Sequence, residues 1–163
     1  MYGNTVKTGD GLAYWLLQSN TGALFTIEGD SSNLNDISAN DSDKAFTVPA
    51  GYEWIVKSVS VKLVSDVSVG NRQIALEFRD DSDVVIYSVR AGAVQAASLT
   101  RYYNFAMGAA DLAAFRDTDY LSNAMPEIHL LAGYDIRVYD KAAIAAATDD
   151  MDVHIIVQVR PIA

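Results

Sequence analysis

The two histidines are the first residues to test for chemistry, because histidine binds metals and transfers protons near neutral pH. His129 and His154 take the outward position of their expected strands, so they could meet and bind a metal with a nearby carboxylate if those strands pair. The sequence lacks a clustered His-x-His with a downstream Glu, the pattern that a β-sandwich metalloenzyme would need. We therefore expect surface or interface histidines and no metal site.

Three acidic clusters are the next candidates, since carboxylates from two converging loops could hold a calcium ion. The clusters are Asp41-Asp43, Asp80-Asp81-Asp83 and Asp149-Asp150-Asp152. None of them matches the twelve-residue calcium loop, because the stretch from Asp30 to Asp41 lacks its central Gly and closing Glu. We favour the simpler interpretation, in which these groups are solvated turns and strand ends.

Nucleophile and phosphate motifs are absent from the sequence. With 0 Cys, the chain can form no disulfide, no thiolate zinc site and no cysteine nucleophile. There is no Gly-x-Ser-x-Gly and no phosphate-binding Gly-rich loop. A glycosidase needs paired carboxylates in a cleft with sugar-stacking aromatics, but of the two tryptophans, Trp15 and Trp54, the second has core parity. We expect no enzymatic activity and no cofactor.

Composition limits the partners of this chain. The length of 163 residues favours a single domain, and the net charge of −9 disfavours binding to a phosphate backbone. No window approaches the roughly 20 apolar residues that cross a bilayer. Lys7 is the one basic residue before the short apolar run Leu12–Leu17, unlike a secretory signal. We expect no nucleic-acid or membrane partner, and synthesis in the cytoplasm where the chain folds.

The elements that must position these residues are strands, because apolar residues alternate with period two from Ala45 onward. Val153, Ile155 and Val157 alternate with polar residues, and further strands are expected at Ile74–Phe78, Val84–Val89, Tyr102–Met107, Glu127–Leu131 and Tyr134–Val138. In the long stretch from Tyr52 to Ser65 the apolar parity switches at Lys57-Ser58. This switch predicts a β-bulge or sharp bend at that dipeptide, since one extra residue restores the inward-facing set.

The sum is about eight strands with short connections, which predicts an all-β fold: an antiparallel two-sheet sandwich, with the strand count of a jelly roll. The Ala-rich segments Ala106–Phe115 and Lys141–Thr148 are expected to hold a turn or two of helix each. We place the sandwich domain at residues 45–163. Residues 1–44 are expected to form an extended N-terminal arm followed by a polar loop at Asp30–Asp43.

Surface contacts are expected from aromatic and apolar residues. The run Tyr14, Trp15, Leu16 and Leu17 would be an association site if exposed, so we predict that it binds a partner. The alternative is that the arm adds an edge strand to its own sheet. Tyr102, Tyr103 and Tyr139 place rings on both faces of their strands, either as interface residues or as caps of the sheet ends.

A short internal echo relates two segments of the chain. Val48–Val56 aligns with Leu130–Val138, and both contain Ala-Gly-Tyr followed by an acidic residue. This echo indicates either that one sandwich has two similar corners or that unrelated strand-turn-strand segments have converged on similar short sequences.

Residues 45–160 resemble small virion proteins of tailed bacteriophages. The resemblance is carried by the run from Val48 to Leu63, by Val69-Gly-Asn-Arg, by Leu76-Glu-Phe-Arg-Asp, and by Leu131-Ala-Gly-Tyr-Asp-Ile-Arg-Val-Tyr-Asp with the acidic Asp149–Val153 before the closing strand. It is a pattern of strands and corners rather than a catalytic signature. It does not extend to residues 1–44.

The resemblance implies a jelly-roll decoration or cement protein of the phage head, which binds neighbouring major capsid subunits on the outside of the virion without catalysis. It further implies a homo-oligomer, a dimer or trimer on a symmetry axis. Similar short chains also serve as tail or neck components. A tail or neck component, or a host-attachment component of the virion that binds glycans, is therefore the alternative function.

Overall fold

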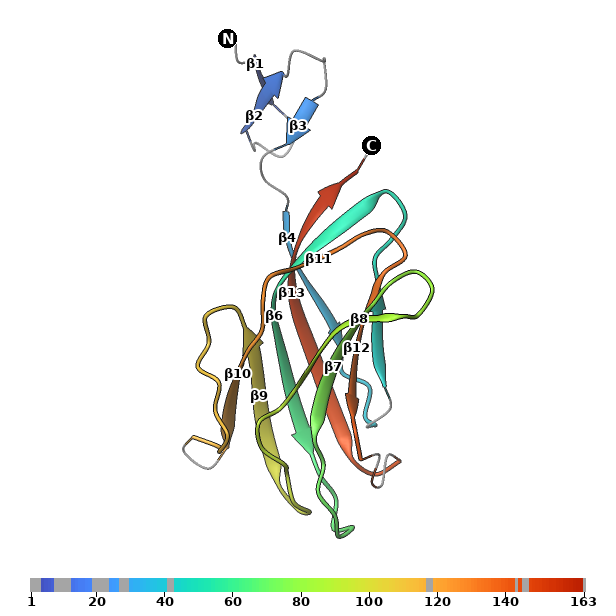
Figure 1. The fold of residues 1–163 in the computed structure, drawn as a ribbon, viewed down its shortest axis with the longest axis vertical. Helices are drawn as coiled ribbons and strands as arrows, with labels where there is room; N and C mark the ends of the chain where they lie inside the picture. Colours follow the sequence, from blue (N-terminus) through green and yellow to red (C-terminus); the bar gives the residue numbers. More distant parts are fainter. Residues whose placement is uncertain are drawn as a thin grey trace.

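The protein is built entirely of strands in its described parts (Figure 1). The computed structural model describes residues 4–7, 13–18, 24–26, 30–40, 43–116, 119–142, 144 and 147–162. Two sheets form the body, as the alternating pattern predicted. The larger has six strands: β4 (Asp30–Asp36), β6 (Tyr52–Val64), β9 (Thr100–Ala106), β10 (Tyr120–Ala124), β11 (Ile128–Leu130) and β13 (Asp150–Pro161). The smaller has four: β5 (Lys44–Thr47), β7 (Ile74–Arg79), β8 (Val85–Arg90) and β12 (Asp135–Asp140).

The strand pairing gives the jelly roll directly. β4 pairs with β13, β5 with β12, β6 with β9 and β7 with β8, all antiparallel, so the pairs are nested like one long hairpin. The hairpin is rolled up by the pairing of β6 with β13 and of β7 with β12, which makes the orders β9-β6-β13-β4 and β5-β12-β7-β8. This closure of eight strands into two facing sheets is the jelly-roll architecture. The predicted fold class is confirmed.

The predicted β-bulge lies where the parity of β6 switches. Ser58 pairs with Ile156 and Val56 pairs with Val157, so Lys57 is the extra residue of β6. The bulge restores the inward set on both sides, because Trp54, Val56, Val59, Val61 and Leu63 are all buried. On its other edge, β6 pairs with β11 before the bulge and with β9 after it.

The two echoing segments form matching turns that touch each other. Gly51 and Gly133 both have positive φ, at 82° and 86°. Each follows the same hydrogen-bond pattern, in which the amide of the next tyrosine donates to the carbonyl three residues back. The turns are joined because the Val48 amide donates to the Tyr134 carbonyl, and the Gly133 amide donates to the Val48 carbonyl. The echo therefore marks two similar corners packed side by side.

The core lies between the two sheets and takes residues from both. Val59, Val61 and Phe105 of the larger sheet are fully buried in one apolar cluster with Leu76 and Ile136 of the smaller sheet. Burying a side chain of this size contributes about 1.5–3 kcal/mol. The inward positions of the alternating segments are thus where the pattern placed them.

Three local expectations were wrong. Asp30–Asp36 is not a loop but the edge strand β4, which pairs with β13, because backbone pairing can extend a sheet without an apolar pattern. β10 was not expected, and it pairs with β9 in parallel rather than antiparallel. The described residues of Ala106–Phe115 and Lys141–Thr148 contain turns and bends instead of helix, since such short segments lack the length to sustain one.

The N-terminal strands form a sheet of their own, with the order β1 (Asn4–Lys7), β2 (Ala13–Gln18) and β3 (Leu24–Thr26). The boundary predicted at residue 44 stays a prediction, although β4 on the N-terminal side of it belongs to the larger sheet. Within the described residues, no helix is long and apolar enough to span a membrane.

Candidate contact surfaces

The predicted partner-binding residues lie in one strand. Tyr14, Trp15, Leu16 and Leu17 belong to β2, which pairs with β1 on one edge and with β3 on the other. Their side chains lie outside the described part of the structure. Their binding role therefore stays a prediction.

A second apolar surface lies at β8, the edge strand of the smaller sheet (Figure 1). Val84, Val85, Ile86 and Tyr87 are 58%, 46%, 49% and 37% exposed, although all four are large and apolar. Together we call these four residues the β8 strip. Edge strands usually carry charges or proline that block pairing with another chain. In β8 the one charged residue is Arg90, at its end, so the strip has the composition of a contact surface.

The β8 strip is positioned by the turn before it and by a bulge within it. The Asp80 carboxylate accepts hydrogen bonds from the amides of Ser82 and Val84, both at 2.9 Å, so this acidic group forms a turn that caps its own backbone. Phe78 pairs with Tyr87 and Arg79 pairs with Val85, which leaves Ile86 as the bulged residue. The bulge takes Ile86 out of the ladder, and Ile86 is exposed like its neighbours Val85 and Tyr87.

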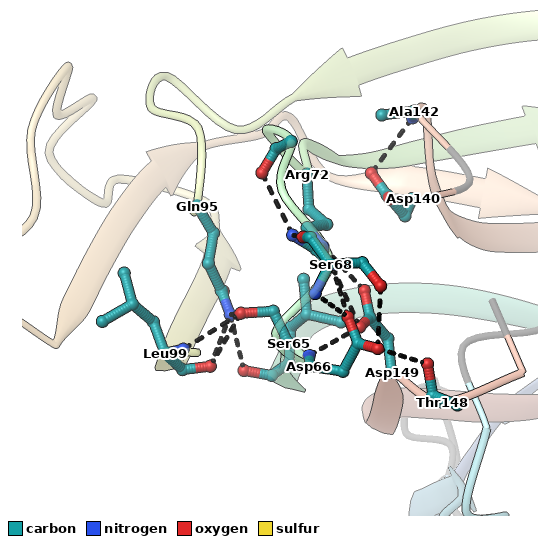
Figure 2. Close-up of polar contacts among 12 residues, drawn as sticks. Ser65, Asp66, Ser68, Arg72, Gln95, Leu99, Asp140, Ala142, Thr148 and Asp149 are labelled. Carbon is teal, nitrogen blue, oxygen red and sulfur yellow. Dashed lines mark hydrogen bonds and ion pairs between the residues drawn. The ribbon is translucent and has the colours of Figure 1, made fainter. Parts of the chain in front are cut away.

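Arg72 organises the loops at one end of the sandwich (Figure 2). Its Nε donates to Asp149 at 2.7 Å, and its Nη2 donates to Asp149 and Asp66 at 3.2 and 3.0 Å. Its Nη1 donates to the carbonyls of Ser68 and Gly70 at 2.8 and 3.0 Å, so all five of its N–H groups have partners. The hydrogen bond to Asp149 raises the pKa of Arg72. Both side chains of this ion pair are fully buried.

A neutral network lies beside the Arg72 cluster (Figure 2). The Gln95 amide donates to the carbonyls of Leu63 and Leu99 and to the Ser65 hydroxyl, at 2.8–3.1 Å. Its carbonyl oxygen accepts from the Tyr103 hydroxyl at 3.0 Å, and burial raises the pKa of Tyr103. The two networks tie β6, β9 and the loop that holds Gln95 into one rigid end.

The acidic clusters do not form a calcium site in the described residues. Asp149 is paired with Arg72, and Asp152 with Lys62 at 2.9 Å. Asp43 is paired with Arg137 and Asp80 caps its turn, while Asp41 lies outside the described residues. No group of three or more potential metal ligands occurs in the parts of the chain that the structure describes.

The two histidines are not brought together. His129 lies opposite Ile55 on one edge of β6, and His154 lies opposite Ser60 on the other edge, so β6 separates them. His129 contacts Glu127 at 3.4 Å. The pKa of Glu127 is lowered, mainly by its hydrogen bond from Lys57.

The three predicted surface tyrosines have three different environments. Tyr103 is in the core, which corrects its expected place at an interface or sheet end. Tyr139 packs against the Arg137 guanidinium at 4.3 Å and donates to Glu77 at 2.7 Å. Tyr102 lies on the outer face of the larger sheet and stacks on Tyr120.

A hollow of about 280 Å³ lies at the edge of the larger sheet, beside β10. We call it the β10 hollow; its lining is Asn104, Ala110, Leu112, Arg116, Tyr120, Leu121 and Ser122. Sequence reasoning missed it because it did not expect β10. The one hint in the sequence was the segment Tyr120–Ala124. It is too short, and its polar and apolar residues alternate too irregularly, for it to be recognised as a strand.

The comparisons with known proteins give no family. No family model matches the chain, and no curated protein matches it. Solved structures with a similar arrangement include an exo-β-agarase, with 13% identity and a TM-score of 0.32 over 99% of this chain and 22% of that one. The VP2 subviral particle of infectious bursal disease virus has 11% identity and a TM-score of 0.33 over 86% of this chain and 39% of its own.

The chain therefore spans well under half the length of these structures. The Gt strain of the same virus gives a TM-score of 0.34 and 8% identity over 94% of this chain and 39% of that one. Several neighbours are thus virus-particle structures. Scores and identities this low carry no argument about function, and the jelly roll stands on the strand order of this chain.

Proposed function

We propose that the protein is a structural protein of a virion, and specifically a decoration or cement protein on the outer surface of a tailed-phage head. It binds across neighbouring major capsid subunits and performs no catalysis. The observation that carries this proposal is the β8 strip, four consecutive apolar residues at an edge strand that stay exposed among the described residues. The sequence resemblance of residues 45–160 to phage virion proteins supports it.

The strip and its surroundings define the chemistry of the partner. Among the described strands β8 pairs with β7 alone, so an extended coat segment with apolar side chains could add to its other edge as a further strand. Asp81 and Asp83 lie in the turn next to the strip, and the whole chain carries a net charge of −9. A coat surface with basic residues beside the apolar segment is the complementary partner.

Binding of this kind stabilises a shell by linkage. A protein that binds assembled subunits but not free ones stabilises the assembled state, by about 2.7 kcal/mol per site at a concentration 100 times its Kd. A rigid body transmits this stabilisation from one subunit to the next. The buried Arg72–Asp149 pair and the Gln95 network support such rigidity at one end of the sandwich.

The experiment measures co-sedimentation with heads that lack the decoration protein, prepared from the phage that carries this gene. We expect Ile86→Asp to reduce occupancy at least tenfold, because a charge in the strip loses its solvation on contact. Val69→Asp is the matched control, since Val69 is 94% exposed but lies in a loop away from β8. Both variants should unfold at the temperature of the parent.

Equal occupancy of the Ile86→Asp and Val69→Asp variants would remove β8 from the proposed interface. Failure of the parent protein to sediment with heads would reject the decoration function itself. A mass measurement in solution tests the proposed dimer or trimer. Deleting residues 1–28, which leaves β4 intact, tests whether Tyr14, Trp15, Leu16 and Leu17 contribute, and unchanged occupancy would exclude them.

A further inference from the structure

The β10 hollow presents an aromatic ring with one open face. Tyr120 and Tyr102 stack with their centroids 4.8 Å apart and their planes at 16°. Tyr120 is nevertheless 51% exposed, and it lines the hollow. Because Tyr102 covers one face of the ring, the exposed half is the other face and the edge. Such a face attracts the weakly positive C–H groups of a ligand.

Polar groups of three kinds surround this ring. Asn104 and Ser122 lie directly opposite each other on β9 and β10, so their side chains share the outer face of the sheet. Arg116 lines the same hollow and is itself exposed. Within the described part of the chain, the Asn104 amide, the Ser122 hydroxyl and the Arg116 guanidinium have no side-chain partner. They are free to bind a ligand, as donors and, for Asn104 and Ser122, also as acceptors.

The backbone holds the hollow open. The Leu112 amide donates to the Ser122 carbonyl at 2.9 Å, and Arg116 and Tyr120 exchange two backbone hydrogen bonds at 2.6 and 3.1 Å. Gly92 lets the same segment pack closely, since a Cβ there would lie 2.2 Å from the Leu112 carbonyl oxygen. A preformed site loses little conformational entropy on binding.

We propose that the β10 hollow binds one ring of an acidic sugar. The apolar face of the sugar packs on Tyr120, its hydroxyls bond to Asn104 and Ser122, and its carboxylate pairs with Arg116. The volume of about 280 Å³ is near the lower end of small-molecule sites, which fits a single ring better than a long chain. The neighbouring Asp119 does not repel the carboxylate strongly, because Arg101 pairs with it at 2.6 Å. This inference does not depend on the decoration function.

The test uses the full-length protein and saturation-transfer NMR with four monosaccharides at millimolar concentration. The acidic probes are N-acetylneuraminic acid and glucuronic acid, and the neutral probes are N-acetylglucosamine and glucose. We expect the acidic pair to bind and Arg116→Gln to weaken them about tenfold, the size of one charge-assisted hydrogen bond. Tyr120→Ala should abolish binding. Arg90→Gln and Tyr52→Ala are the matched controls, since both residues are exposed and neither lines the hollow.

Binding of the acidic probes that is lost in Tyr120→Ala and weakened in Arg116→Gln, but retained in both controls, supports the proposal. No binding of any probe overturns it. Equal binding of neutral and acidic probes overturns the role of Arg116, and binding that survives Tyr120→Ala overturns the site. Because Arg116 is exposed, its substitution leaves the fold intact, which unfolding temperatures should confirm. None of these results bears on sedimentation with heads, so the two proposals can fail separately.

Discussion

Replacing Arg72 by methionine should destabilise the protein strongly, because it breaks an ion pair whose two side chains are both fully buried. Methionine has a similar length but donates no hydrogen bond, so the five bonds from the guanidinium are lost together. Asp149 would remain fully buried, with the amide of Asp66 as its one donor, at 2.7 Å. The sandwich then has to bury a carboxylate without its counter-ion.

The magnitude follows from that burial. Removing one partner of a buried ion pair costs about 3–5 kcal/mol. For a chain of this length each kcal/mol lowers the melting temperature by about 2–4 °C, so the expected loss is about 6–20 °C. Domains have an unfolding free energy of about 5–15 kcal/mol, and for most values between these limits the loss amounts to a third or more of the total stability.

The assay is thermal and urea unfolding followed by circular dichroism, with Lys62→Met as the matched control. Lys62 pairs with Asp152 at 2.9 Å, but both side chains are partly exposed, so its loss should cost less than about 1 kcal/mol. A double variant, Arg72→Met with Asp149→Leu, should recover part of the stability because it removes the stranded charge. If Arg72→Met loses no more than Lys62→Met, the reasoning about the buried pair is wrong.

Two further predictions concern acid and the bulge. The pKa of Asp66 is lowered below its ordinary value of 3.8, mainly by the hydrogen bond from the Thr148 hydroxyl. The pKa of Asp36 is lowered as well, mainly by its hydrogen bond from Ser38. Both carboxylates therefore bind a proton more readily in the unfolded chain than in the folded protein. The two ionised carboxylates therefore stabilise the fold above pH 3.8, and this stabilisation is lost as the pH falls through their lowered pKa values. The urea midpoint of the Asp66→Asn variant should fall less across that pH range than the midpoint of the parent protein. Deleting Lys57 should shift one half of β6 by one residue. Either Trp54 and Val56 or Val59 and Val61 would then point to the solvent face, so the variant should lose cooperative unfolding. The Lys57→Ala variant keeps the residue count and should retain cooperative unfolding.

The bulge in β6 is a feature that the pattern of apolar residues along the chain predicts without any tertiary information. The inward residues of β6 change parity at Lys57, and one extra residue is the shortest way to keep both halves apolar inside. That conclusion needs no knowledge of the partner strand, because side-chain alternation is a property of the strand itself. The matching turns at Gly51 and Gly133 follow in the same way, since a residue at positive φ favours glycine wherever it occurs.

The edge strands show where local pattern ends. β4 has almost no apolar alternation, and its place was decided by the free edge of β13. β8 is rich in valine and isoleucine, and its sequence resembles that of a buried strand, yet it is exposed because no other strand among the described residues pairs with its outer edge. Burial of an edge depends on what lies beside it, which the strand's own residues do not encode.

The sequence by itself determined the all-β class, the inward face of each long strand, the bulge and the corner turns, since all of these depend on neighbours along the chain. The tertiary structure alone decided the strand order, the pairing of Arg72 with Asp149 across 77 positions, and the β10 hollow. These features join residues that are distant in sequence. Their geometry depends on how the nested hairpin rolls up, because no local pattern specifies which distant groups will meet.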